Sequence, residues 1–180
     1  MKSIDHEGYL ELYRSRLAAL DSRRALAFGA FCAERLWLRS SGPATLRSLA
    51  RELIDEAWKY AGIGLPAEEP ASGFPARLRA AALGLDPRAP EVVAAGRIAM
   101  MAHIALEGTS DDAGRVAALA LEFTETASGC PPGDWRDHAP DRDSLQPPVQ
   151  AEYDVHVAAL ERLRDSQGGF REALRDLLDA

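Results

Sequence analysis

The chain has 180 residues, of which 47% are hydrophobic, and its formal net charge is −7. Thirty-three residues are alanine and 12 are aromatic, so the apolar material is mostly small and suits closely packed helices. Glycine and proline fall mostly between apolar runs, which excludes a collagen-like or disordered chain, and the length favours one domain.

The charge is unevenly distributed, with +2 over residues 1–60 and −9 over residues 61–180. No dense run of Lys and Arg is present, which argues against nucleic-acid binding because that binding neutralises many phosphates. The acidic part fits a basic protein partner, although solubility alone accounts for it as well.

The sequence also predicts a compartment. The first seven residues have no apolar core of a signal peptide, and the apolar stretch 92–106 is shorter than the ~20 residues that span a bilayer. Cys32 and Cys130 lack the C-x-x-C spacing and do not make a disulfide framework. We therefore expect a cytoplasmic protein without a membrane span.

Apolar residues recur at the helical period in nearly all of the chain, and no stretch alternates as a strand does. We expect helices over residues 7–20, 22–40, 44–61, 75–84, 90–107, 111–128, 148–167 and 170–179. The fold class is therefore predicted to be all-α, a compact single-domain bundle of seven or eight helices.

Polar residues and glycines mark several of the expected helix ends. Asp21 and Ser110 are expected N-caps, Gly62 is an expected left-handed end, and Gly108 is expected to close the helix at 90–107. The short link at 108–110 makes the two flanking helices antiparallel neighbours.

Residues 25–33 are apolar on all sides, which predicts a central helix. The helices at 90–107 and 111–128 are expected to complete the core, with Phe31 and Met100 both buried.

Clustered carboxylates on the helix at 44–61 are the first candidate site. Glu52 shares a face with Asp55 and Glu56, and such a cluster can bind a divalent cation when a facing helix adds ligands. The alternative, which we favour, is a solvated face neutralised by nearby basic residues.

Two histidine–carboxylate pairs at helical spacing follow. His103 precedes Glu107 by one turn, and Glu152 precedes His156 by one turn. Each pair could orient a base or complete a metal site, but a buried histidine satisfied by its neighbour is the commoner arrangement.

Arg97 interrupts an apolar helix and needs a partner if it is buried. We expect an ion pair with Glu122 or Glu125 on the following helix.

The segment 134–143 gathers acidic residues around a tryptophan. Its members are Asp134, Trp135, Asp137, Asp141 and Asp143. The spacing does not match a calcium-binding EF-hand loop. Trp135 either packs back on the domain or anchors a partner.

Short stretches in order resemble the YjaG-like family, a bacterial family of unknown function. They are Cys32-Ala33-Glu34-Arg35-Leu36, Leu53-Ile54-Asp55-Glu56-Ala57-Trp58, the hairpin through His103 and Gly108, and Pro148-Val149-Gln150-Ala151-Glu152-Tyr153-Asp154. The loop at 129–147 departs from that pattern. The resemblance implies a compact all-α fold and supplies no activity.

No phosphate-binding loop, nucleophile elbow, zinc-protease or kinase motif is present. We therefore expect no cofactor and no catalysis, and the leading hypothesis is a protein-binding module. One alternative is an immunity-type inhibitor that masks a basic toxin through the acidic segment. Another is a metal-dependent hydrolase that uses the carboxylates of 44–61 with His103 and Glu107. A homodimer formed through an apolar helix face also remains open.

Overall fold

The computed structural model of the chain describes residues 4–65, 73–129 and 141–180. Within these ranges the regular structure is entirely helical, which confirms the all-α class. The elements are α1 (Ile4–Leu17), α2 (Ser22–Arg39), α3 (Ala44–Ile63), α4 (Phe74–Ala81), α5 (Pro90–Ala105), α6 (Ser110–Ala127), the 3-10 turn η1 (Arg142–Ser144), α7 (Pro147–Asp165), α8 (Phe170–Ala173) and α9 (Arg175–Leu178).

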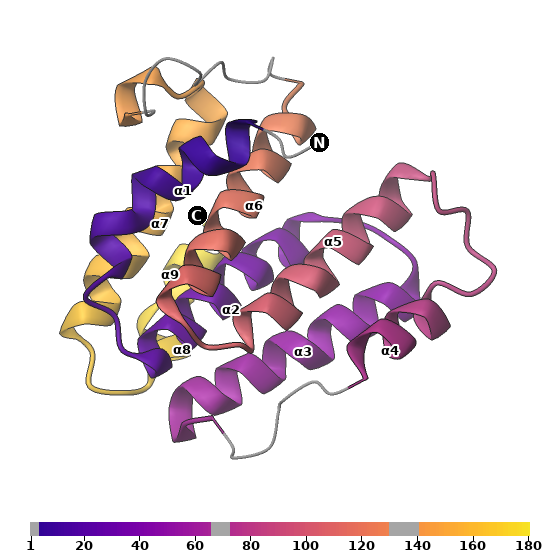
Figure 1. Cartoon of the computed structure of the whole chain (residues 1–180), viewed down its shortest axis with the longest axis horizontal. Helices are drawn as coiled ribbons and strands as arrows, with labels where there is room; N and C mark the ends of the chain where they lie inside the picture. Colours follow the sequence, from indigo (N-terminus) through magenta and orange to yellow (C-terminus); the bar gives the residue numbers. More distant parts are fainter. Residues whose placement is uncertain (1–3, 66–72, 130–140) are drawn as a thin grey trace.

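Helix α2 runs through the middle of the molecule, with α1 and α7 on one side of it and α3, α4 and α5 on the other (Figure 1). Every residue of α2 from Ala25 to Leu36 is buried, as the all-round apolar pattern predicts. Helices α3, α5, α6 and α7 all pack against it. The prediction of a central helix is therefore confirmed.

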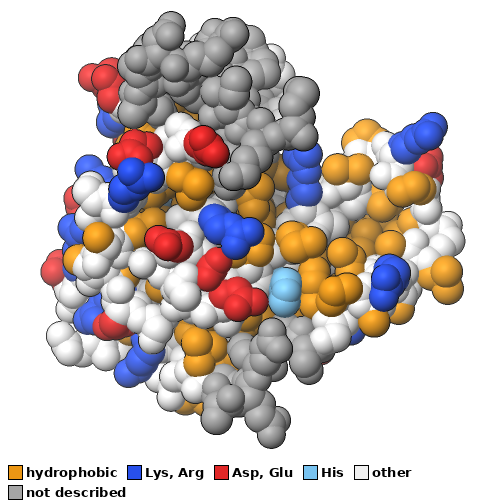
Figure 2. Space-filling model, in the orientation of Figure 1, with side chains coloured by type: hydrophobic (Ala, Val, Ile, Leu, Met, Phe, Trp, Pro, Cys, Tyr) orange, Lys and Arg blue, Asp and Glu red, His pale blue; other side chains and the backbone are white. Residues whose placement is uncertain are grey.

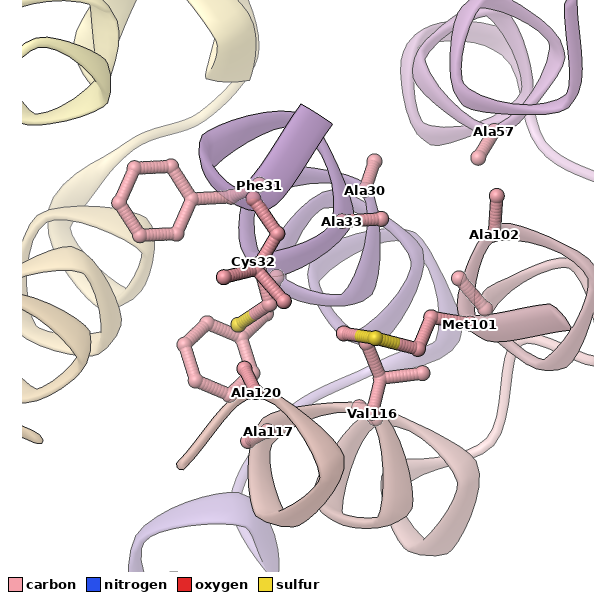
Figure 3. Close-up of a cluster of buried hydrophobic side chains, with 14 of the residues drawn as sticks. Ala30, Phe31, Cys32, Ala33, Ala57, Met101, Ala102, Val116, Ala117 and Ala120 are labelled. Carbon is pink, nitrogen blue, oxygen red and sulfur yellow. The ribbon is translucent and has the colours of Figure 1, made fainter. Parts of the chain in front are cut away.

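Small side chains allow these helices to approach closely. Figure 3 shows Ala57 of α3 and Ala102 of α5 pointing toward each other, and both are fully buried. Met101 fills the space between α5 and Val116 of α6, while Phe31 points to the opposite side of α2. The alanine-rich composition is thus used in the helix contacts.

Two of the expected helix ends need correction. Thr109, not Ser110, is the N-cap of α6, because Thr109 has the extended backbone and its hydroxyl accepts the Asp112 N–H at 3.1 Å. Helix α3 continues through Gly62, and Gly64 takes the positive φ of 91° that ends it. Asp21 caps α2 as predicted, accepting the Arg24 N–H at 2.9 Å.

Helix α5 packs in the core on one side only, so the expectation that Met100 is buried is wrong. Met100 is 40% exposed rather than buried, although Phe31 is fully buried as predicted. Helices α2, α3 and α6 cover one side of α5, and the other side faces outward. Apolar residues around the whole helix could not reveal this, because exposure depends on which neighbours are present.

None of the helices in the described ranges is long and apolar enough to cross a bilayer.

Candidate functional site

A buried ion pair joins α2 to α7. Arg35 donates from Nε to Glu152 Oε1 at 3.0 Å and from Nη2 to Glu152 Oε2 at 2.9 Å. Both residues are at most 3% exposed. Arg39, nearer the surface, donates to Glu152 Oε2 at 2.6 Å. The two-point geometry compensates the desolvation of both charges.

The same arginine holds the end of the chain. Arg35 also donates to the backbone carbonyls of Leu177, Leu178 and Ala180. Carbonyls near a helix C-terminus carry partial negative charge and lack partners within the helix. Arg35 therefore fastens α9 and the residues after it to the central helix.

His156 extends this cluster into the core. Its Nδ1 lies 2.7 Å from the hydroxyl of Tyr13, and its Nε2 lies 3.3 Å from Glu152 Oε1. Within the described ranges Nε2 has no partner at hydrogen-bonding geometry, so it lies close to the Glu152 carboxylate without a hydrogen bond of good geometry. The predicted pair of Glu152 and His156 does come together, and its carboxylate is directed to Arg35.

Burial sets the protonation states in this cluster. It raises the pKa of the Tyr13 hydroxyl and of the Cys32 thiol well above their usual values. Burial alone would also raise the pKa of Glu152, but His156 and Arg35 outweigh it and hold that pKa well below the usual range. The phenol and the thiol stay protonated and the carboxylate stays charged, which suits a structural cluster.

A second ionic cluster lies beside the first along α2. Glu34, 3% exposed, accepts from Arg51 at 2.6 Å, from Arg171 of α8 at 2.5 Å and from the Trp58 indole N–H at 2.7 Å. Arg51 also pairs with Asp55, and this hydrogen bond holds the pKa of Asp55 below its usual value. Adjacent residues Glu34 and Arg35 thus attach α8 and α9 to α2.

Sequence reasoning missed the roles of Glu34 and Arg35. The available signal was a pair of charged residues within one turn of a helix segment that is otherwise apolar on all sides. Charges in such a place must find buried partners.

The carboxylates of α3 each have a separate partner. Asp55 pairs with Arg51, Glu52 lies 2.8 Å from Arg77 of α4, and Glu56 accepts the Tyr60 hydroxyl at 3.2 Å. Glu52 and Asp55 are exposed, as expected for a solvated face.

The histidine pair of α5 is arranged differently from that of α7. His103 stacks on Phe74 with ring centroids 4.2 Å apart, and its buried Nδ1 has no hydrogen-bond partner in the described residues. Glu107 is exposed in the turn that follows α5. Across the described parts of the chain, no three His, Cys, Asp or Glu side chains are grouped as metal ligands would be.

The acidic segment is only partly described. Asp134, Trp135 and Asp137 lie outside the described residues, as does Cys130. Asp141 caps η1 by accepting the Ser144 N–H at 2.9 Å. Asp143 is exposed and lies 3.2 Å from Arg142.

The outward side of α5 carries a regular row of residues, which we call the α5 seam. Its members are Val93, Arg97, Met100 and Ile104 of the helix and Glu107 of the turn that follows it. They are spaced by four, three, four and three residues, which is the spacing of a heptad seam in a coiled coil. Val93 is 39% exposed and Met100 40% exposed, and Ile104 is partly buried. Figure 2 shows hydrophobic side chains gathered over α5 on this face.

Arg97 belongs to this seam, which overturns its expected ion pair. The side chain is exposed and forms no ion pair within the described ranges, while Glu125 accepts the Tyr9 hydroxyl at 2.9 Å. Arg97 points away from the core, so no buried partner is needed. It lines a groove of about 410 Å³ with Pro90, Val93, Ala94, Phe123, Thr126 and Ala127.

No family model, curated protein or solved structure matches this chain.

Proposed function

We propose that this protein is a binding module for another polypeptide and that the α5 seam is its contact surface. The observation that carries the proposal is the seam itself. Its apolar members line up at coiled-coil spacing on the outward side of α5, where Val93 and Met100 are exposed and Ile104 is partly buried. A heptad seam is the pattern that a second helix recognises.

The distribution of charged groups supports the same proposal. Arg35 and Glu152 are buried in a mutual ion pair, and Glu34 is held by two arginines. These buried charges are neutralised by residues of the same chain, and the ion pairs attach one helix to another. By contrast, Arg97 stands beside exposed apolar side chains without an ion pair in the described ranges. A basic group beside exposed apolar side chains favours a partner that offers an acidic group opposite it.

Two alternative hypotheses from the sequence, the inhibitor of a basic toxin and the metal-dependent hydrolase, stay predictions. The inhibitor hypothesis depends mainly on Trp135 and Asp134, which lie outside the described residues. The hydrolase hypothesis needs the carboxylates of α3 to converge with His103, whereas Glu52 and Asp55 pair with arginines. Neither hypothesis gains a specific observation in its favour.

Site-specific photo-crosslinking in the native cell tests the proposal. A benzophenone amino acid at Met100 should give a covalent adduct with a polypeptide, and the substitution Arg97→Glu in the same chain should strongly reduce it. The matched control position is Leu38 of α2, which is 44% exposed. The proposal fails if position 100 gives no adduct with any polypeptide, or if positions 100 and 38 give the same adducts.

A further inference from the structure

We infer that the occupant of the α5 seam is a second copy of this chain, packed with its own α5 antiparallel to the first. The inference rests on the proposed function, since it names the partner for the same surface. It follows from the positions of the two charges. Arg97 lies three residues before Met100 and Glu107 three residues after Ile104, so an antiparallel copy places each charge against its opposite.

The positions of opposite charge determine one register. In an antiparallel pair related by a twofold axis between Met100 and Ile104, Arg97 lies opposite the partner's Glu107. Met100 then lies opposite the partner's Ile104. The twofold axis repeats both contacts, so Met100 and Ile104 meet apolar side chains and each charge meets its opposite, while Val93 lies beyond the paired positions.

Other registers of the same two seams are less favourable. A twofold axis at Arg97 places two arginines opposite each other, and like charges in direct opposition are destabilising. An axis midway between Arg97 and Met100 places each guanidinium against an apolar thioether, where it would be desolvated without a partner. Charge complementarity therefore selects the register with the Arg97–Glu107 contacts.

Neither charged group forms an ion pair with another described residue of its own chain. Arg97 and Glu107 are both exposed, and neither forms an ion pair with another residue of the described ranges. Forming the intermolecular pair thus breaks no ion pair among the described residues. The pair also accounts for one basic residue on this side of α5 and one acidic residue in the turn that follows the helix.

A glycine beside the seam leaves room for the second backbone. Gly96 lies in the helix interior next to Arg97, and a Cβ placed there would meet no atom of the described residues within 4 Å. A glycine inside a helix costs about 0.5–1 kcal/mol relative to alanine. The packing of this chain gives no reason for that cost, whereas a helix crossing close to α5 does.

The mass of the purified full-length chain in solution tests the inference. Light scattering from about 10 μM to about 1 mM should show the mass rising from that of the 19.5-kDa chain toward twice that value. The single substitutions Arg97→Glu and Glu107→Arg should each hold the protein at the monomer mass. The double substitution R97E/E107R should restore the dimer, because it exchanges the two charges.

Two control variants separate the seam from other exposed surface. Leu38→Asp of α2 and Arg79→Glu of α4 alter an exposed apolar and an exposed basic residue outside the seam, and both should dimerise as the unmodified chain does. Met100→Asp should remain monomeric. Circular dichroism of each variant verifies that the helices are retained.

The inference is overturned if the chain stays monomeric up to about 1 mM, or if the double charge exchange fails to restore a dimer that the single exchanges abolish. A dimer that is insensitive to all seam substitutions overturns it too. In each case a photo-adduct from position 100 with a different polypeptide would leave the proposed function standing. The absence of any adduct from position 100 would contradict both the dimer and the proposed function.

Discussion

Gly29 of α2 lies directly against Ala105 of α5, and a Cβ at Gly29 would stand 2.7 Å from the Ala105 Cβ. Real Cβ atoms essentially never come so close, so the two backbones approach to a distance that only glycine allows here. This contact brings α5 against the fully buried face of the central helix. The opposite side of α5, which includes Gly96, has no such neighbour.

The same substitution at these two glycines should therefore act in opposite directions. Gly29→Ala should destabilise the fold by about 1–3 kcal/mol, because the added methyl forces α2 and α5 apart. Gly96→Ala should stabilise it by about 0.5–1 kcal/mol, because alanine is the better helix former and open space surrounds the site. Urea denaturation at low protein concentration measures both. Equal effects of the two substitutions would contradict the packing described for α5.

Breaking the buried pair of Arg35 and Glu152 should be costly. Arg35→Met leaves a carboxylate in the core with only the half-exposed Arg39 and His156 nearby, and it frees the chain end held by Arg35. We expect a loss of about 3–5 kcal/mol in the free energy of unfolding. Thermal or urea unfolding of the variant provides the value.

A double-mutant cycle separates the pair from its surroundings. Adding Glu152→Leu to Arg35→Met removes the unpaired charge, so the double variant should lose much less stability than the two single losses added together. Strictly additive losses would mean that the two side chains do not interact as described.

Acid should weaken the fold through Glu152. The pKa of this carboxyl lies well below its usual range in the folded chain, whereas an unfolded glutamate has a pKa of about 4.3. Between the two pKa values only the unfolded chain binds the proton. The stabilising contribution is therefore complete above the unfolded pKa and declines as the pH falls toward the folded one.

The urea midpoint of the unmodified chain should thus drop as the pH is lowered from about 5 to about 3. Glu152→Gln should show a shallower drop over the same range, because the titrating group is gone. Glu161→Gln alters an exposed carboxylate on the same helix and should follow the unmodified chain. Parallel curves for all three proteins would rule out a special role for Glu152.

Phe31 and Met100 offer a direct measure of burial, since the sequence predicts both in the core. Phe31 is fully buried, so Phe31→Ala should cost about 3–5 kcal/mol. Met100 is 40% exposed, so Met100→Ala should change the stability of the monomer by at most about 0.5 kcal/mol. A large loss at Met100 in dilute solution would show that this side of α5 is covered within a single chain.

Much of the fold could be predicted from local patterns. Asp21 was recognisable as an N-cap because its carboxylate serves amides only three residues away. Local signals fail where neighbouring residues compete for one role, as Thr109 and Ser110 do at the start of α6. For the site, the sequence identified Glu152 and His156 as a pair but not Arg35 as their partner, which is 117 residues from Glu152 along the chain.

The helical class, the position of the central helix and most of the helix starts follow from local patterns in the sequence. These properties depend on periodicity, on apolar residues around a whole helix and on contacts within one turn. The packing of the helices sets which side of α5 faces outward and which distant groups neutralise Glu34 and Arg35. Exposure and ion pairing depend on helices that are far apart in the chain. The sequence of a helix that is apolar on all sides therefore does not indicate which side stays exposed.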